Sequence, residues 1–329
     1  MASTVVGSLV KNVVVRSKYS GLELGARHWV SPEQDPAEKQ RINILAVHGW
    51  LDNAASFDLM ATSIMEASVA RRVGCELVAL DLPGHGRSGW RPGERSHYNY
   101  PEYVADIVGV LEELQWGEGT VLLGHSMGGG LALLASAVLG SPKVSRSVLI
   151  EGLGPVTCSE EKVVESLRDA IGNNMRFFAA DAHQRREYPS AEHAVEARLK
   201  ATPYMSRESA SLLVDRDLQA AEGGVGVLLS KDPTAKLSSL LRYTEGQVHA
   251  MIQALQVPVL VVEGTDPWMR NWMNLQQMQA RLDLLSSAGR LHALITVSGG
   301  HHHLHMEPAS LQHCLPSILD FIFSSQDQE

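Results

Sequence analysis

The chain has 329 residues, of which 44% are hydrophobic and 20% charged, and these proportions exclude a disordered protein. Its 28 Lys and Arg against 37 Asp and Glu give a net charge of −9, so we expect neither nucleic acid nor an anionic membrane surface as a partner. Three cysteines without CxxC spacing indicate neither a disulfide framework nor a cysteine zinc site, and they fit a reducing compartment.

The N-terminal segment shows no signal-peptide hydrophobic region, and no apolar run reaches the ~18 to 20 residues that cross a bilayer. We therefore expect a cytoplasmic protein with no membrane span. The first 20 residues include Lys11, Arg16 and Lys18 but no acid, which a transit peptide would also show. The valines at positions 13–15 favour a strand instead.

The predicted elements begin with a hairpin, in which residues 12–16 pair with residues 22–30. Short apolar runs then alternate with helical patterns. The predicted strands are residues 42–47, 77–80, 120–123, 147–150, 257–262 and 291–297, and the predicted helices are residues 57–67, 100–114, 130–139, 275–285 and 311–323. Continuous β-rich runs suit parallel strands covered on both faces, so the pattern predicts an α/β fold with a mostly parallel, doubly wound sheet.

One interval interrupts this alternation. Residues 155–256 carry helical patterns and no convincing strand, which predicts a helical cap inserted between two core segments, residues 1–154 and 257–329. Turn-forming residues at positions 152–155 and Pro258 mark its boundaries.

The pattern GHSMG at residues 124–128 is weakly specific by itself. Here a predicted strand at residues 120–123 precedes it, and a helix of small residues at 129–137 follows it. Strand, sharp turn and helix in this order form a nucleophile elbow, in which a strained backbone lifts the serine hydroxyl above the sheet. We therefore predict Ser126 as a nucleophile rather than an incidental serine in a glycine-rich turn.

A second glycine pattern resembles a dinucleotide-binding loop. Residues 84–89 match GxGxxG after a strand, but residues 90–93 read Trp-Arg-Pro-Gly and cannot begin the helix on which a pyrophosphate would sit. We expect no nucleotide and no other cofactor.

A serine hydroxyl needs a base, which should come from a loop after the last strand. The segment at residues 299–308 offers four histidines, at positions 301, 302, 303 and 305. Such a cluster also suits a metal, but side chains of one short loop rarely converge on an ion without a carboxylate or thiolate. We expect no metal here, and we expect more than one of these histidines to be structural.

Two backbone amides are candidates for an oxyanion hole. The N–H of Met127, at the start of the predicted helix, faces a charge that develops near Ser126. The second donor should come from the loop after residues 44–47, where we expect the N–H of Trp50, with Leu51 in reserve. We interpret the His48 side chain as a brace for this loop.

The spacing of HGW at residues 48–50, DLPGHGRS at 81–88, GHSMG at 124–128 and the C-terminal histidines resembles the α/β-hydrolase superfamily over essentially the whole chain. Residues 48–58 and 299–307 are similar to the serine hydrolase-like proteins. The resemblance implies a Ser, His and acid triad under a helical cap, and no settled substrate. In such relatives the base stands five residues before a Glu-Pro element, which selects His302, whereas counting from the paired glycines selects His301.

Two carboxylates compete to orient the histidine. Asp266 follows the strand at residues 257–262, where most of the superfamily keeps its acid, but the usual Gly-x-x-Asp spacing is one residue short. Glu151 ends the strand at residues 147–150, where some members, including relatives of this group, place the acid. We favour Glu151 and keep Asp266 as the alternative.

These residues predict a serine esterase or thioesterase that acts on a small acyl substrate through an acyl-enzyme on Ser126. Trp50, Phe177 and Trp268 are candidate substrate contacts. Two alternatives stay open: a ligand-binding protein of the same fold with little or no turnover, and a cofactor-free acyltransferase or peroxidase.

Overall fold

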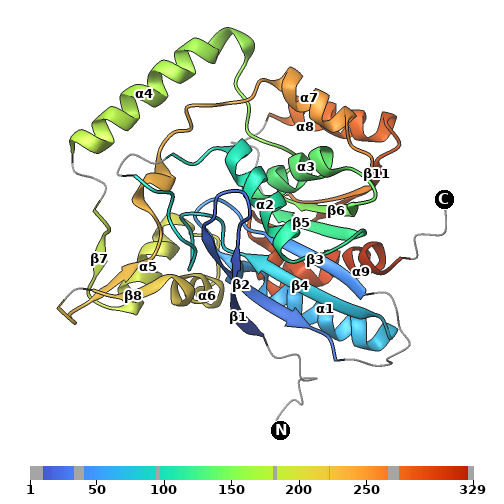
Figure 1. Cartoon of the computed structure of the whole chain (residues 1–329), viewed down its shortest axis with the longest axis horizontal. Coiled ribbons are helices and arrows are strands. Elements are labelled where there is room, and N and C mark those ends of the chain that lie inside the picture. Colours follow the sequence, from blue (N-terminus) through green and yellow to red (C-terminus); the bar gives the residue numbers. More distant parts are fainter. Residues whose placement is uncertain are drawn as a thin grey trace.

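The computed structural model describes residues 10–32, 41–93, 97–180, 184–221, 223–265 and 274–324. Its main sheet has eight strands (Figure 1). In spatial order they are β1 (Lys11–Arg16), β2 (Glu23–Val30), β4 (Gly74–Leu80), β3 (Arg41–Val47), β5 (Thr120–His125), β6 (Val144–Ile150), β10 (Val259–Gly264) and β11 (Leu291–Val297). β1, β2 and β4 pair antiparallel, and every pair from β4 onward is parallel. The predicted hairpin and the mostly parallel sheet are confirmed.

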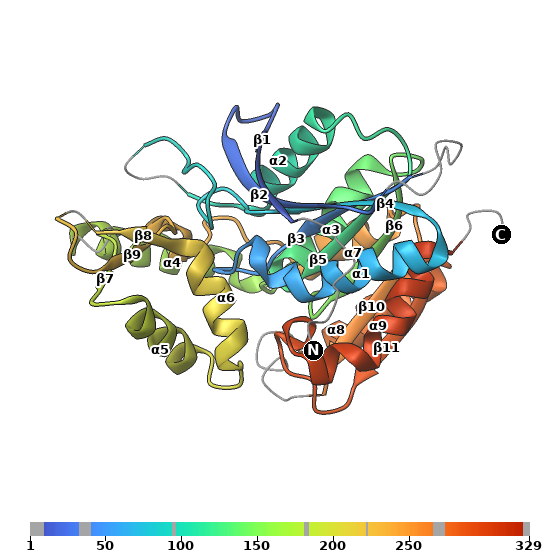
Figure 2. The ribbon, with the colours of Figure 1, turned by 90° about the horizontal axis from the view of Figure 1, so that it is seen from below.

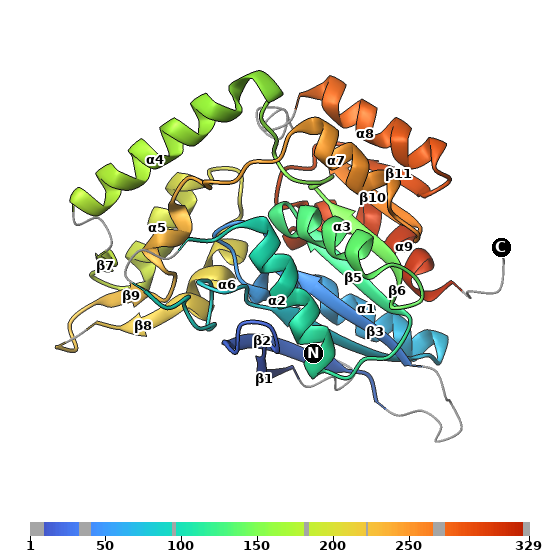
Figure 3. The same cartoon turned by 45° about the horizontal axis from the view of Figure 1, so that its top comes forward.

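Helices cover both faces of this sheet (Figure 3). One face packs against α2 (Tyr100–Glu113), α3 (Met127–Leu139), α7 (Glu245–Gln253) and α8 (Leu275–Ser287), and the other against α1 (Asp58–Arg71) and α9 (Pro308–Phe323). The side chains of β3 show the alternation: Leu45 and Val47 join the first core, while Ile44 and Ala46 join the second. Both faces are buried, which explains the continuous apolar runs in the sequence.

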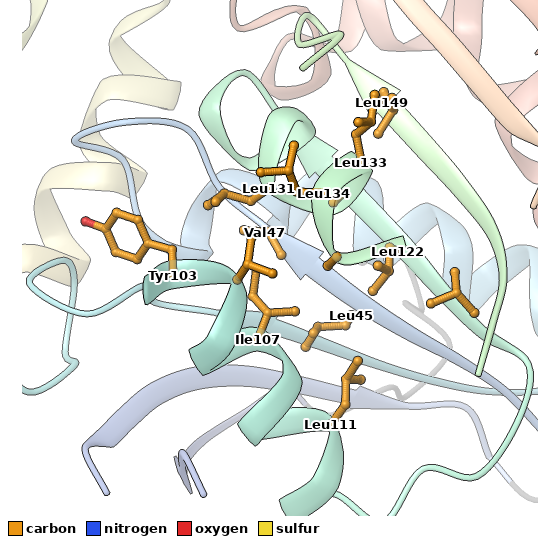
Figure 4. Packing of buried hydrophobic residues seen from close by; sticks show 14 of the residues in the cluster. Leu45, Val47, Tyr103, Ile107, Leu111, Leu122, Leu131, Leu133, Leu134 and Leu149 are labelled. Carbon is orange, nitrogen blue, oxygen red and sulfur yellow. The ribbon is translucent and has the colours of Figure 1, made fainter. Parts of the chain in front are cut away.

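The first core is built where α2 and α3 meet the central strands. Figure 4 shows Val47 of β3 beside Ile107 of α2 and Leu131 of α3. Each fully buried Leu, Ile or Val side chain contributes roughly 1.5–3 kcal/mol of transfer free energy. This packing fixes the orientation of α3, whose first turn adjoins Ser126.

The interval at residues 155–256 contains α4 (Val163–Ala179), α5 (Ala191–Ala201) and α6 (Arg207–Asp217). It also contains a small antiparallel sheet, β7 (Glu187–Tyr188), β9 (Val227–Leu229) and β8 (Leu218–Ala220), which the sequence pattern does not predict. Strands of two or three residues are too short to show a period-2 pattern. Figure 2 places these elements together at one end of the molecule, whereas α7 packs against α3.

Buried polar contacts join α6 to the main sheet. Arg216 donates to the Asp81 carboxylate at the end of β4, with Nη2 to Oδ2 at 2.7 Å. Asn53, in the loop after β3, donates to Asp217 at 2.9 Å. Both carboxylates are buried, so the ion pair and the hydrogen bond offset the free energy lost when the groups leave water.

The helix α4 differs from its neighbours, because it buries only Ala170 and Asn174. Its apolar side chains Val164, Ile171 and Met175 are exposed, at 67%, 45% and 68%. No described helix is both long enough and apolar enough to cross a membrane.

Candidate active site

Ser126 is the single residue between β5 and α3. Its backbone has φ 53° and ψ −117°, a conformation rare for a residue with a side chain. Three hydrogen bonds hold it: its N–H donates to Ile150 O at 2.8 Å, and its carbonyl accepts from Gly129 and Gly130. Ser126 is partly exposed, so the turn presents its hydroxyl at the carboxyl edge of the sheet, as the elbow requires.

Small residues make this turn possible. A Cβ at Gly124 would overlap the carbonyl of Gly128, and a Cβ at Gly128 would overlap the carbonyl of Val47. A Cβ at Gly152 would overlap the carbonyl of Ser126. Strand, elbow and neighbouring loops therefore approach to backbone contact, which only glycine permits.

The structure brings His302 and Glu151 together. Nδ1 of His302, in the loop after β11, lies 3.4 Å from Oε2 of Glu151, at the end of β6. Glu151 is buried and has φ 54°; its N–H donates to Val262 O at 2.8 Å, and its Oε1 accepts from the N–H of Gly264. The carboxylate is thus held in position to accept a hydrogen bond from the imidazole N–H.

The alternative acid, Asp266, lies outside the described residues, and so does the candidate substrate contact Trp268. Their places in the site stay predictions.

The loop that carries His302 is tied to the elbow. Nε2 of His125, the residue before Ser126, lies 2.7 Å from the carbonyl oxygen of His302 and donates to it. Burial, followed by the nearby His303, lowers the pKa of His302 to about 3. The imidazole is therefore neutral near pH 7, the form that a general base needs.

His301, the alternative base, has a different environment. Its Nδ1 accepts a hydrogen bond from the backbone N–H of His303 at 3.1 Å, and its ring lies 5.0 Å from that of Tyr204. One ring nitrogen of His301 therefore closes a turn of the loop.

The two oxyanion candidates lie on neighbouring segments. Met127 is the first residue of α3, so its amide has no carbonyl partner within the helix. Trp50 follows β3, and the contact of Gly128 with the Val47 carbonyl places that loop against the elbow. The Trp50 side chain is 46% exposed and donates to the carbonyl of Ala235, 2.8 Å away.

His48 braces its loop through both ring nitrogens. Nε2 accepts from the N–H of Leu82 at 3.0 Å, so Nδ1 carries the proton and donates to the Gly49 carbonyl at 2.7 Å. Leu51, the reserve donor, has φ 60°, and its carbonyl accepts from Lys231.

A buried charge cluster beside the site was missed by sequence reasoning. Oδ2 of Asp52 lies 3.1 Å from Nε2 of His303 and 3.6 Å from Nδ1 of His125. Arg198 of α5 donates to Oδ1 of Asp52 at 2.6 Å. The carboxylate pKa is held well below its usual range by His303 and Arg198, against the opposing effect of burial. The signal available was that Asp52, His125 and His303 each lie in a segment that the sequence analysis singled out, at residues 48–58, 124–128 and 299–307.

Phe177, the remaining substrate candidate, lies on α4. It is partly buried and packs edge to face against Phe178, with ring centroids 5.5 Å apart. The structure thus places Phe177 in an aromatic pair, and a substrate contact stays a prediction.

A groove of about 950 Å³ lies elsewhere on the molecule, between α2, α3 and α7. Its apolar lining includes Val104, Val108, Leu134, Val138, Tyr243 and Met251. These α3 residues belong to the C-terminal half of the helix, whereas Ser126 precedes its first residue. The groove is therefore not the pocket of the candidate site.

The alpha/beta hydrolase family model matches residues 44–311. A serine hydrolase-like protein of Dictyostelium discoideum is 28% identical over 94% of this chain and 80% of its own length. The crystal structure of a hypothetical protein from Pseudomonas aeruginosa PAO1 gives a TM-score of 0.77 at 29% identity, covering 95% of this chain and 100% of that one. The thioesterase domain of the curacin biosynthetic pathway gives 0.73 at 23% identity, covering 96% and 100%, and has the same fold. Together with the elbow, these matches show that the chain belongs to the alpha/beta hydrolase family.

Proposed function

We propose that this hydrolase cleaves a carboxylic ester or thioester of a small molecule through an acyl-enzyme on Ser126. The observation that carries the proposal is the strained Ser126 at the carboxyl edge of the sheet. It directly follows β5, and Glu151 directly follows the neighbouring strand β6. The pairing of Glu151 with His302 supplies a base that is already oriented.

The reaction begins when His302 takes the Ser126 hydroxyl proton and the freed oxygen attacks the acyl carbonyl carbon. The oxyanion of the tetrahedral intermediate accepts hydrogen bonds from the Met127 and Trp50 amides, each worth about 3 kcal/mol of barrier lowering. His302 then returns the proton to the leaving alcohol or thiol. Water repeats the sequence and releases the acid. Glu151 accepts the other imidazole N–H throughout and stabilises the imidazolium.

The names of the relatives support the choice of bond. The Dictyostelium relative is named a serine hydrolase-like protein, and the curacin neighbour is named a thioesterase domain, so thioesters are tested beside esters. Phe177, which is partly buried, and Trp50, which is exposed, are the apolar side chains that we expect the acyl group to contact.

The test is labelling with a fluorophosphonate, combined with a panel of esters and thioesters of graded acyl length. Stoichiometric labelling at Ser126 and turnover on one class are expected, and Ser126→Ala should lower kcat about 10⁴- to 10⁶-fold. Ser145→Ala, whose hydroxyl only donates to backbone carbonyls of the Gly119 turn, is the matched control. Folded protein that takes no label would instead support the ligand-binding alternative.

A further inference from the structure

Three buried side chains from three separate loops converge beside the candidate active site. Asp52 follows β3, His125 ends β5 and His303 follows β11, and none is more than 4% exposed. One ligand atom of each lies within 4.8 Å of the other two. The C-terminal histidine loop by itself brings no carboxylate to a metal, but the fold adds a carboxylate and a second histidine from two other loops.

Nδ1 of His125 is a buried acceptor that has no hydrogen-bond donor in the described part of the chain. The carbonyl of His302 can only accept, so Nε2 of His125 carries the ring proton and Nδ1 of the neutral ring presents a lone pair. This Nδ1 is buried and makes no hydrogen bond within the described part of the chain. The group that faces it is Oδ2 of Asp52, 3.6 Å away and also electron-rich. A lone pair and a carboxylate this close are stabilised by a cation between them.

Gly49 keeps this place accessible. A Cβ at Gly49 would lie 2.9 Å from Oδ2 of Asp52 and 2.9 Å from Nδ1 of His125. Any other residue there would occupy the space next to both atoms, which the glycine leaves unfilled.

We propose that these residues form a site for a divalent transition metal of the zinc type, with Asp52 Oδ2, His125 Nδ1 and His303 Nε2 as ligands. Tetrahedral zinc with bonds of about 2.0–2.1 Å separates its ligand atoms by about 3.3 Å. The distances to Oδ2, 3.1 and 3.6 Å, bracket that value. Two imidazoles favour zinc, cobalt or nickel over magnesium or calcium. To bind the metal, Nε2 of His303 must lose the proton that it donates to Asp52: an imidazolium releases this proton to solvent, and a neutral ring changes to the tautomer protonated at Nδ1.

Arg198 shapes the site without joining it. Its Nη2 lies 2.6 Å from Oδ1 of Asp52, which turns Oδ2 toward the imidazoles, as outer partners of metal ligands commonly do. The same guanidinium lies 3.4 Å from Nε2 of His303, and its charge repels a dication. This repulsion opposes metal binding. A bound ion would link the loop of Trp50 to the loop of His302.

The experiment titrates the EDTA-treated 329-residue chain with Zn²⁺ by calorimetry and follows its thermal unfolding in parallel. One bound equivalent and a higher Tm are expected, since a ligand of the native state stabilises it by mass action. His303→Gln and Asp52→Asn should each weaken Zn²⁺ affinity about 10- to 100-fold or more. His313→Gln, on the exposed surface of α9, should bind as the unmodified chain does.

The proposal would be overturned if the natively folded protein bound no Zn²⁺. It would also be overturned if the His303→Gln variant folded and bound Zn²⁺ with unchanged affinity. Visible absorption of Co²⁺-loaded protein gives a second readout, because four-coordinate Co²⁺ absorbs far more strongly than the hydrated ion. Neither measurement uses ester hydrolysis, so a failure here leaves the proposed function untouched, and the reverse also holds.

Discussion

Two residues of the site, Ser126 and Glu151, share an uncommon backbone conformation. Their φ angles are 53° and 54°, and strain of this kind costs on the order of 1–3 kcal/mol at each residue. The two amides make equivalent hydrogen bonds: that of Ser126 donates to the end of β6, and that of Glu151 donates to Val262 on β10. The sheet therefore continues one residue past β5 and β6 and holds the proposed nucleophile and the proposed acid in register.

Substitution of Glu151 by Gln tests the orienting role of the carboxylate. The amide keeps nearly the same size but can donate toward Nδ1 of His302, which favours the wrong imidazole tautomer. We expect kcat to fall about 10³- to 10⁴-fold with the fold preserved, measured on the best ester or thioester of the panel.

Asp266→Asn is the matched comparison, because it makes the same chemical change at the competing acid. Activity within a few fold of the unmodified chain is expected there. If Asp266→Asn lowered kcat more than Glu151→Gln does, Asp266 would be the carboxylate that orients His302.

At the scale of elements, the elbow depends on how closely β3, β5 and α3 approach. Gly128→Ala would place a Cβ onto the carbonyl of Val47, which belongs to the central strand and cannot move aside. We expect a loss of about 1–3 kcal/mol or more in unfolding free energy, measured by urea denaturation.

Gly172→Ala on α4 is the control for this substitution. Its Cβ meets only Arg176 at 3.6 Å, an ordinary contact, and alanine favours a helix interior. A gain of about 0.5–1 kcal/mol is expected. Equal effects at both glycines would mean that the overlap at Gly128 is relieved by a backbone shift.

The ion pair between α6 and β4 gives the next prediction. Arg216→Met leaves the Asp81 carboxylate buried without its guanidinium, which typically costs 3–5 kcal/mol. The fall should appear in equilibrium unfolding. In Arg207→Met, the same change removes an exposed pair with Glu192 and Glu196, and the unfolding midpoint should stay where it is. A midpoint unchanged in both would contradict the importance of the buried pair.

For the whole molecule, the mostly parallel sheet and the elbow could be predicted because their signals are local and strong. An apolar run such as residues 42–47 predicts a strand that is buried on both faces of a sheet. The glycines around Ser126 predict close backbone contacts, because any larger residue would overlap a neighbouring carbonyl. The small sheet within residues 187–229 could not be predicted, because its strands are too short to show an alternation of apolar and polar residues. The cluster of Asp52, His125 and His303 requires three loops to meet, which no local pattern reveals.

Buried histidines are a property of the molecule as a whole. Burial lowers the pKa of His48 to about 4 and those of His85 and His302 to about 3, and it holds the pKa values of His125 and His305 well below 6.5. In the unfolded chain these rings take up protons near pH 6.5, whereas in the folded chain they stay neutral to a lower pH. The unfolded state therefore binds more protons under mildly acidic conditions.

This difference predicts acid-sensitive stability. A histidine with a lowered folded pKa contributes its full stability above about pH 6.5 and loses it as the pH falls toward the folded value, by about 1.4 kcal/mol per pH unit for each ring. The unfolding free energy should therefore fall steeply between about pH 6 and pH 4 in urea titrations at stepped pH.

His305→Leu isolates one ring of the set, since both of its nitrogens are buried and make no hydrogen bond in the described structure. The variant should lower the slope by about 1.4 kcal/mol per pH unit and be more stable at pH 5, because leucine needs no partner there. His313→Gln on the exposed face of α9 should leave the slope unchanged. If the unfolding free energy of the unmodified chain, His305→Leu and His313→Gln fell with the same slope against pH, His305 would titrate alike in the folded and unfolded chain.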